Sequence, residues 1–117
     1  MTVEQLLEID AEYRRRSSAG ELKLIAPRKH NPEGKAWLPI MTVDREGTKV
    51  TAVFSNTDRA HELGKTGEWV VVYYEKDGNE ERCTVVTESR GDLKGKRVIR
   101  GREPECAEYY SRIDPGS

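Results

Sequence analysis

The hydrophobic positions near the start of the chain repeat with a helical period. Acidic side chains come first in residues 2–18 and arginines come last, an order that suits the helix dipole at both ends. Thr2 and Gln5 fit a capping box, in which each side chain bonds a free backbone N–H group of the other residue. The pattern predicts a helix over residues 2–18 that stops at Gly20. Its apolar face is predicted to hold Leu6, Leu7, Ile9 and Tyr13.

Later apolar segments bounded by turn signals are typical of strands, and in residues 48–54 the apolar side chains of Val50, Ala52 and Phe54 alternate onto one face. Four such strands are predicted: residues 37–43, 48–54, 68–75 and 81–88. Gly47 lies in the loop between the first two strands, where a longer hairpin loop requires a left-handed residue. Asp77 and Gly78 form the strongest turn signal in the chain. Residues 69–74 carry apolar side chains on both faces, which predicts a central position in the sheet.

The remaining segments complete the predicted order of elements. Residues 22–25 could form a further short strand, and the two prolines and the glycine of residues 26–34 predict an irregular loop. Residues 55–64 read as a short capped helix and residues 96–100 as a last strand. Pro104 opens a C-terminal helix. This helix is predicted to turn four residues inward: Cys106, Tyr109, Tyr110 and Ile113.

This order predicts the α+β class, with an antiparallel sheet of about five strands, N-terminal and C-terminal helices and one short internal helix. One domain is expected over residues 1–113, with a flexible tail at residues 114–117. The chain has 117 residues, and 35% of them are hydrophobic and 35% charged, which predicts a thin core under a solvated shell. Disorder is the competing interpretation, but 20 basic residues nearly balance 21 acidic ones and the apolar residues fall in periodic runs.

Composition also restricts the class of protein. No apolar run approaches the length of a membrane span, and the N-terminus lacks the pattern of a signal peptide. Two cysteines, Cys83 and Cys106, are fewer than a disulfide-held secreted domain usually has. A cytoplasmic protein without membrane contact is therefore expected. Both cysteines fall at predicted core positions.

Motifs for metal, cofactor or catalytic chemistry are incomplete. His61 and Glu62 begin a zinc-protease motif, but Lys65 stands where the second histidine would be. Gly64, Lys65 and Thr66 resemble the end of a phosphate-binding loop, but the glycine at its start is missing and the predicted element order is reversed. Residues 91–96 are one residue short of the same spacing. The sequence therefore predicts no metal ligand, no cofactor and no catalytic residue.

The most suggestive segment is basic and rich in glycine. Glycines let a backbone approach a ligand, and arginines bind phosphate through two parallel hydrogen bonds. The predicted nucleic-acid or phosphate-binding residues are Arg90, Lys94, Lys96, Arg97, Arg100 and Arg102, extended by Arg28 and Lys29 of the proline loop. On the predicted strand 96–100, Arg97 and Ile99 project to one face and the other three residues to the opposite face. The alternative is a solvated surface in which nearby acidic residues pair with these arginines.

Two resemblances to known families bear on these predictions. The stretches IAPR at 25–28, AWLP at 36–39, FSNTDRAHELG at 54–64, WVVVYY at 69–74, TVVTE at 84–88 and RVIRGRE at 97–103 resemble the C-terminal module of certain bacterial and archaeal helix-hairpin-helix proteins. The N-terminal part of those proteins is similar to the DNA-binding start of family X DNA polymerases. This resemblance implies a DNA-associated context, a missing N-terminal region that grips DNA, and no catalytic residues in the present chain. A second, local resemblance, at 38–42, Gly47 and 52–55, is to a hairpin of the secretion-enhancer SseB domain.

Three functional hypotheses follow. The leading one is a non-enzymatic accessory domain that assists DNA or other nucleic-acid transactions through the basic segment, by neutralising phosphates without reading bases. The second is a protein–protein interaction module of an intracellular complex. The third is a small enzyme that acts on a phosphorylated ligand, with His61 or Glu62 as its base.

Overall fold

The N-terminal helix forms as its pattern predicts. In the computed structural model, which describes residues 1–113, α1 runs from Val3 to Ser18. The Thr2 hydroxyl accepts a hydrogen bond from the Gln5 backbone N–H at 3.1 Å, and the Gln5 side chain accepts one from the Thr2 N–H at 2.9 Å. This capping box is confirmed, as is the stop before Gly20, whose φ is +71°. The buried residues of α1 are Val3, Leu6, Leu7, Ile9, Asp10 and Tyr13.

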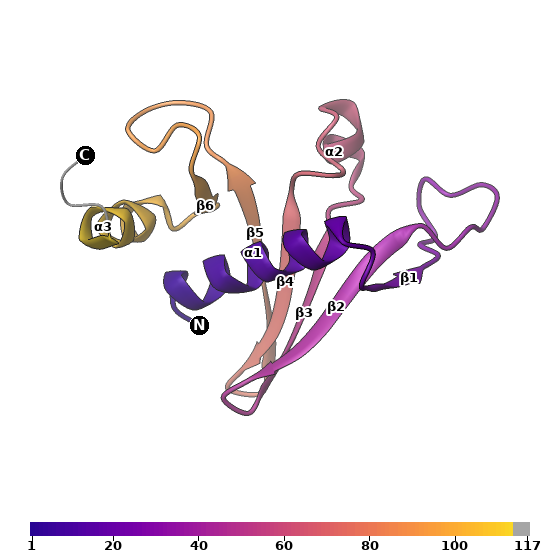
Figure 1. Ribbon diagram of the computed structural model, residues 1–117, viewed down its shortest axis with the longest axis horizontal. Coiled ribbons are helices and arrows are strands. Elements are labelled where there is room, and N and C mark those ends of the chain that lie inside the picture. The colour runs from indigo at the N-terminus through magenta and orange to yellow at the C-terminus, as the bar shows by residue number, and fades with distance from the viewer. Residues whose placement is uncertain (114–117) are drawn as a thin grey trace.

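Six antiparallel strands follow one another in the sheet in the same order as in the chain (Figure 1). They are β1 (Lys23–Ile25), β2 (Leu38–Arg45), β3 (Thr48–Phe54), β4 (Val70–Lys76), β5 (Asn79–Thr87) and β6 (Arg97–Ile99). The α+β class and the antiparallel sheet are confirmed. The sheet has one strand more than the predicted five because Lys23–Ile25 pairs with residues 38–40 of β2.

Two-residue turns join the two central hairpins. Asp77 and Gly78 both have positive φ, +52° and +80°, so the predicted turn between β4 and β5 is confirmed. The turn between β2 and β3 is tighter than predicted, because Glu46 and Gly47 alone make it, with φ of +53° and +82°. Two successive left-handed residues match the twist of the flanking strands, and this match lets Asp44 continue the ladder opposite Lys49.

The two remaining helices are α2 (Asp58–Glu62) and α3 (Glu103–Ile113). The Thr57 hydroxyl caps α2 by accepting a hydrogen bond from the Ala60 N–H at 3.1 Å. On α3, Cys106 is fully buried, as predicted, whereas Ile113 is 58% exposed, so its predicted inward position is wrong. Ile113 is the last residue of the helix and lies beyond the part of the core that the helix reaches. The predicted flexible tail, residues 114–117, lies outside the described residues.

The core lies between α1 and one face of the sheet. Alternate residues of the central strands point to α1, among them Val50, Ala52, Val72 and Val85. Tyr13 fixes α1 to the sheet, because its hydroxyl donates to the Pro39 carbonyl at 2.7 Å and accepts from the Phe54 N–H at 2.8 Å. Helix α3 contacts α1 and β6 and therefore lies on the same side (Figure 1). The opposite face of the sheet, called the open face below, carries the candidate site.

Candidate functional site

The open face holds a solvent-accessible hollow of about 510 Å³. Its floor follows from strand alternation: Trp69, Val71 and Tyr73 occupy successive open-face positions at the start of β4 and along it, while Val70 and Val72 point to α1. Val71 lies opposite Val53 of β3 on one side and opposite Thr84 of β5 on the other. A hollow of this size lies within the range of small-ligand sites, about 300–1,000 Å³.

The two sides of the hollow differ in chemistry. The side formed by β1, β2 and β3 is aliphatic, with Ile25, Leu38 and Val53. The side formed by β5 and the residue after β6 is polar and cationic, with Arg82, Thr84 and Arg100. Ser55, Asn56 and Thr57 close the end near α2. The arrangement suits a ligand that has an apolar body and an anionic group.

The two arginines of the hollow are in different electrostatic states. Arg82 is exposed, and within residues 1–113 its guanidinium group has no hydrogen-bond or ion-pair partner. Arg100 is 51% exposed and contacts Glu103 at 2.9 Å and Glu88 at 3.4 Å. Ion pairs exposed to this degree are weak, roughly 0–1 kcal/mol, so an incoming anion can replace a carboxylate at Arg100.

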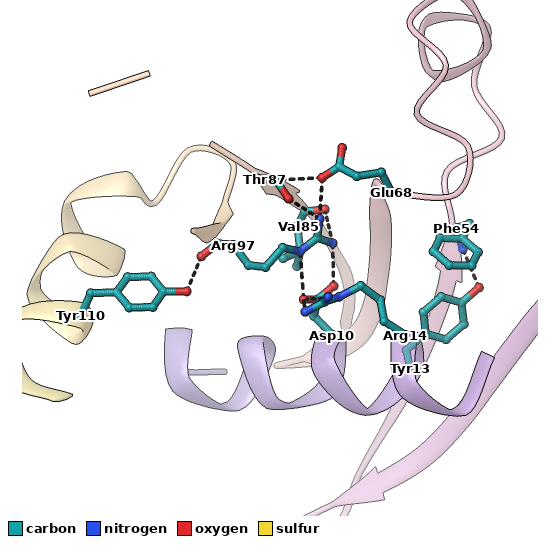
Figure 2. Close-up of polar contacts among 9 residues, drawn as sticks. All are labelled: Asp10, Tyr13, Arg14, Phe54, Glu68, Val85, Thr87, Arg97 and Tyr110. Atoms are coloured by element: carbon teal, nitrogen blue, oxygen red, sulfur yellow. Dashed lines mark hydrogen bonds and ion pairs between the residues drawn. The ribbon is translucent and has the colours of Figure 1, made fainter. Parts of the chain in front are cut away.

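Arg97, a central residue of the predicted basic site, is part of the internal structure instead (Figure 2). Its guanidinium group donates to both carboxylate oxygens of Asp10, at 3.1 and 2.8 Å, and also to Glu68. Its side chain is 12% exposed, while that of Asp10 is fully buried. Arg14 donates to the same carboxylate at 3.1 Å. Arg97 therefore joins β6 to α1 and does not present its charge to a ligand.

The other basic residues of the segment do not form one positive surface either. Arg102 donates to Glu105 at 3.0 Å and to the Met1 carbonyl at 3.0 Å, and this pairing with Arg102 lowers the pKa of the Glu105 carboxyl. The ammonium group of Lys96 lies 4.9 Å from the centre of the Tyr110 ring, a cation–π contact. Arg90 and Lys94 are exposed in the loop between β5 and β6, without an ion-pair partner within residues 1–113.

Arg28 and Lys29 do not extend that surface as predicted. They belong to the loop between β1 and β2, while the basic segment adjoins β6, and β1 and β6 are the opposite edges of the sheet (Figure 1). Lys29 has Asp58 at 3.9 Å, and Arg28 is exposed. The eight predicted residues are therefore divided between two edges of the sheet, and Arg100 is the single one that lines the hollow.

Two histidines join the proline loop to α2. The rings of His30 and His61 stack with their centres 3.7 Å apart. His30 Nε2 lies 2.8 Å from the Asp58 carboxylate, and His61 Nε2 lies 2.7 Å from Asn56 Oδ1. The hydrogen bond from His30 lowers the pKa of the Asp58 carboxyl. His61 and Glu62, the bases proposed for an enzyme, do not line the hollow, although Asn56 links His61 to its edge.

The cysteines have the environment of core residues. Both are free thiols, Cys106 fully buried and Cys83 partly buried. Burial raises the pKa of the Cys83 thiol to about 11 and also raises the pKa of Cys106. Thiols with a raised pKa are weak nucleophiles at neutral pH because little thiolate is present.

Three broader observations complete the description. No helix within residues 1–113 is long and apolar enough to cross a membrane. The same residues contain no cluster of three or more histidine, cysteine or acidic side chains arranged to hold a metal ion. Comparison with protein-family models, with curated proteins and with solved structures finds no match to this chain. Both family resemblances therefore stay predictions.

Proposed function

We propose that this domain is an accessory nucleic-acid-binding module that uses its open sheet face, not the continuous segment from Arg90 to Arg102, as the contact surface. The observation that carries the proposal is that guanidinium groups and aromatic rings line the same hollow. Arg82 and Arg100 lie on one side of it, and Trp69 and Tyr73 lie at its floor. Modules that bind single strands or backbones combine these two features, because cations contact phosphates and rings stack on bases.

The charge balance predicts modest and salt-sensitive affinity. The chain has a formal net charge of −1, so no long-range positive field attracts a polyanion. If Arg82 and Arg100 neutralise two phosphates of a single strand, the logarithm of affinity falls with the logarithm of salt concentration with a slope of about −1.4. Raising salt from 50 to 200 mM then weakens binding roughly sevenfold.

The test is a titration of a fluorescently labelled single-stranded oligonucleotide at several salt concentrations. Replacing Arg82 and Arg100 together with Gln removes both cations of the hollow and is expected to abolish most of the salt dependence. Arg15→Gln with Arg112→Gln is the matched control, because both of these arginines are exposed and outside the hollow. Absence of binding to the unaltered domain at low salt and high protein concentration would refute the proposal.

A third double variant tests whether the hollow or the basic segment predicted from the sequence contributes more to nucleic-acid affinity. Arg90→Gln with Lys94→Gln removes the two exposed cations of the β5–β6 loop. On the present proposal this change lowers affinity less than the change in the hollow does. A larger loss of affinity in the loop variant would indicate that the basic segment, and not the hollow, contacts the nucleic acid.

One observation favours a second candidate function, a protein–protein interaction module. The β1–β3 side of the hollow is aliphatic, with Ile25, Leu38 and Val53, and an apolar side chain of a partner protein would fill it. A pull-down after nuclease treatment distinguishes the candidates. Partners that persist after nuclease and are lost on Val53→Asp are proteins bound at this face.

A further inference from the structure

The hollow has an apolar floor, and such a floor suits an unpaired base better than a base within a duplex. Val71 forms the middle of the floor, with an aromatic side chain before and after it on the same face, Trp69 and Tyr73. Same-face neighbours on a strand are about 7 Å apart, so Trp69 and Tyr73 lie on either side of Val71 with their Cα atoms about 13 Å apart. A paired base has both faces covered by its neighbours in the stack, whereas an unpaired base can lay one face on such a floor.

The free hydrogen-bonding groups of the hollow lie on a different side from the groups that are already bonded. Near α2, the Asn56 amide donates to the Lys29 carbonyl at 2.9 Å and its oxygen lies against His61. The Ser55 and Thr57 hydroxyls contact each other at 3.2 Å. On the β4–β5 side, the Tyr73 hydroxyl, the Thr84 hydroxyl and the Arg82 guanidinium group have no protein partner within residues 1–113.

These free groups are suited to an acceptor. Tyr73 and Arg82 lie directly opposite each other across β4 and β5, and the backbone of Arg100 bonds that of Thr84 at 2.9 Å. Two guanidinium groups and two hydroxyls therefore border one side of the floor. A phosphate accepts hydrogen bonds from the three free groups directly and from Arg100 in place of Glu103, and guanidinium groups bind it through paired bonds.

We infer that the hollow holds one unpaired nucleotide, with its base over Val71 and stacked on the Trp69 ring, and with its phosphate against Arg82 and Arg100. This inference rests on the proposed function and gives it a substrate class, single-stranded in preference to double-stranded nucleic acid. The floor accepts any flat base, because stacking does not distinguish sequences. The same chemistry is present in a free nucleoside monophosphate and in a nucleotide within a strand.

The first experiment compares three labelled ligands of equal length: oligodeoxythymidine, the same strand annealed to its complement, and an abasic sugar–phosphate strand. Stacking of a base on an aromatic residue is worth about 1–3 kcal/mol, so the single strand is expected to bind roughly 5- to 150-fold more tightly than the abasic strand. Thymidine monophosphate, thymidine and inorganic phosphate, added as competitors, separate the free nucleotide from one within a strand. If the hollow binds a free nucleotide, thymidine monophosphate is expected to compete with the labelled strand at millimolar concentration.

Val53→Gln tests the floor without changing charge, because Val53 lines the hollow and a larger polar side chain interrupts its apolar half. Thr42→Gln is the matched control, since Thr42 is an exposed residue of β2 on the same face, outside the hollow. Val53→Gln is expected to remove the preference for the single strand over the abasic strand, while Thr42→Gln retains it.

A fluorescence measurement keeps the test decisive if Val53→Gln does not fold. Trp37→Phe leaves Trp69 as the sole tryptophan, and binding of a base on the floor is expected to quench its emission. If single strand, duplex and abasic strand bind alike and Trp69 is not quenched, the inference is wrong while the proposed function stands. If none of the three binds at low salt, both fail.

Discussion

Replacing Arg97 should destabilise the domain, because its guanidinium group pairs with the buried carboxylate of Asp10 and joins β6 to α1. Arg97→Gln leaves the fully buried carboxylate of Asp10 with Arg14 alone. Breaking a buried ion pair from one side costs about 3–5 kcal/mol. A domain of this length typically has an unfolding free energy of about 6–17 kcal/mol, so the loss is a large part of the total.

Urea unfolding followed by circular dichroism measures this cost. At a typical slope of about 2 kcal/mol per molar urea, Arg97→Gln is expected to lower the unfolding midpoint by about 2 M. Arg100→Gln is the matched control, because the Arg100 side chain is 51% exposed and its pairs with Glu88 and Glu103 are expected to be worth about 1 kcal/mol or less. A midpoint shift for Arg97→Gln no larger than that of the control would refute the structural role of Arg97.

A double-mutant cycle distinguishes loss of the pair from loss of side-chain volume. Asp10→Leu together with Arg97→Met removes both charges and keeps the volume apolar. Replacing a buried pair in this way is often close to neutral, so the double variant is expected to be more stable than either single variant of the cycle, Asp10→Leu or Arg97→Met. The interaction free energy from the cycle should be about 2–3 kcal/mol if the two side chains contact each other in solution.

Three further predictions concern the core and the turns. Burial raises the pKa of Tyr13 from 10.0 to about 12. The stabilisation that comes from this shift is fully present below about pH 10 and is lost as pH rises through about 12. Tyr13→Phe should therefore flatten the pH dependence of the unfolding free energy between these two values. Cys83 and Cys106, both with raised pKa, should react with a thiol reagent at pH 8 far more slowly in the native protein than in urea, and equal rates would contradict their burial. Gly78 has φ of +80°, so Gly78→Ala should lower the unfolding free energy measured in urea by about 1 kcal/mol. Gly67→Ala should lower it less, because Gly67 has no positive φ and free space surrounds it.

The local parts of the fold are predictable from the sequence because local chemistry determines them. The capping box of Thr2 and Gln5 and the turn at Asp77 and Gly78 depend on neighbours within a few residues. The burial of Asp10 is not predictable in this way. Its partner Arg97 is 87 residues away in the chain, and no periodicity connects an acidic residue of the first helix with an arginine of the last strand.

The sequence does place Arg97 and Arg100 on opposite faces. The predicted alternation of residues 96–100 puts Arg97 with Ile99, and Ile99 is fully buried in the structure. Val98, on the face of Arg100, is fully buried as well, so alternation alone does not show which arginine is internal. The distant partner Asp10 decides it, because an unpaired buried charge is too costly.

The hollow is not predictable from residues 69–74. Both faces of this segment carry apolar side chains, and this pattern predicts that other elements pack on both faces of the strand. The structure places α1 and α3 on one face and leaves Val71 and Tyr73 lining the hollow on the other. The signal in the partner strand is weak but real: Arg82 and Thr84 alternate with half-buried Cys83 and buried Val85. A strand that alternates polar side chains on one face with apolar side chains on the other is typical of a sheet that is covered on one face only.

The meander leaves part of two long strands unpaired at the borders of the sheet. The outermost strands, β1 and β6, have three residues each and pair only with residues 38–40 of β2 and 85–87 of β5. Within residues 1–113, residues 41–45 of β2 and 79–83 of β5 therefore have no strand partner on their outer side. Long, flat borders invite sheets to join from molecule to molecule and so promote aggregation. The charged side chains along these stretches, among them Asp44, Arg45, Glu80 and Arg82, oppose such joining.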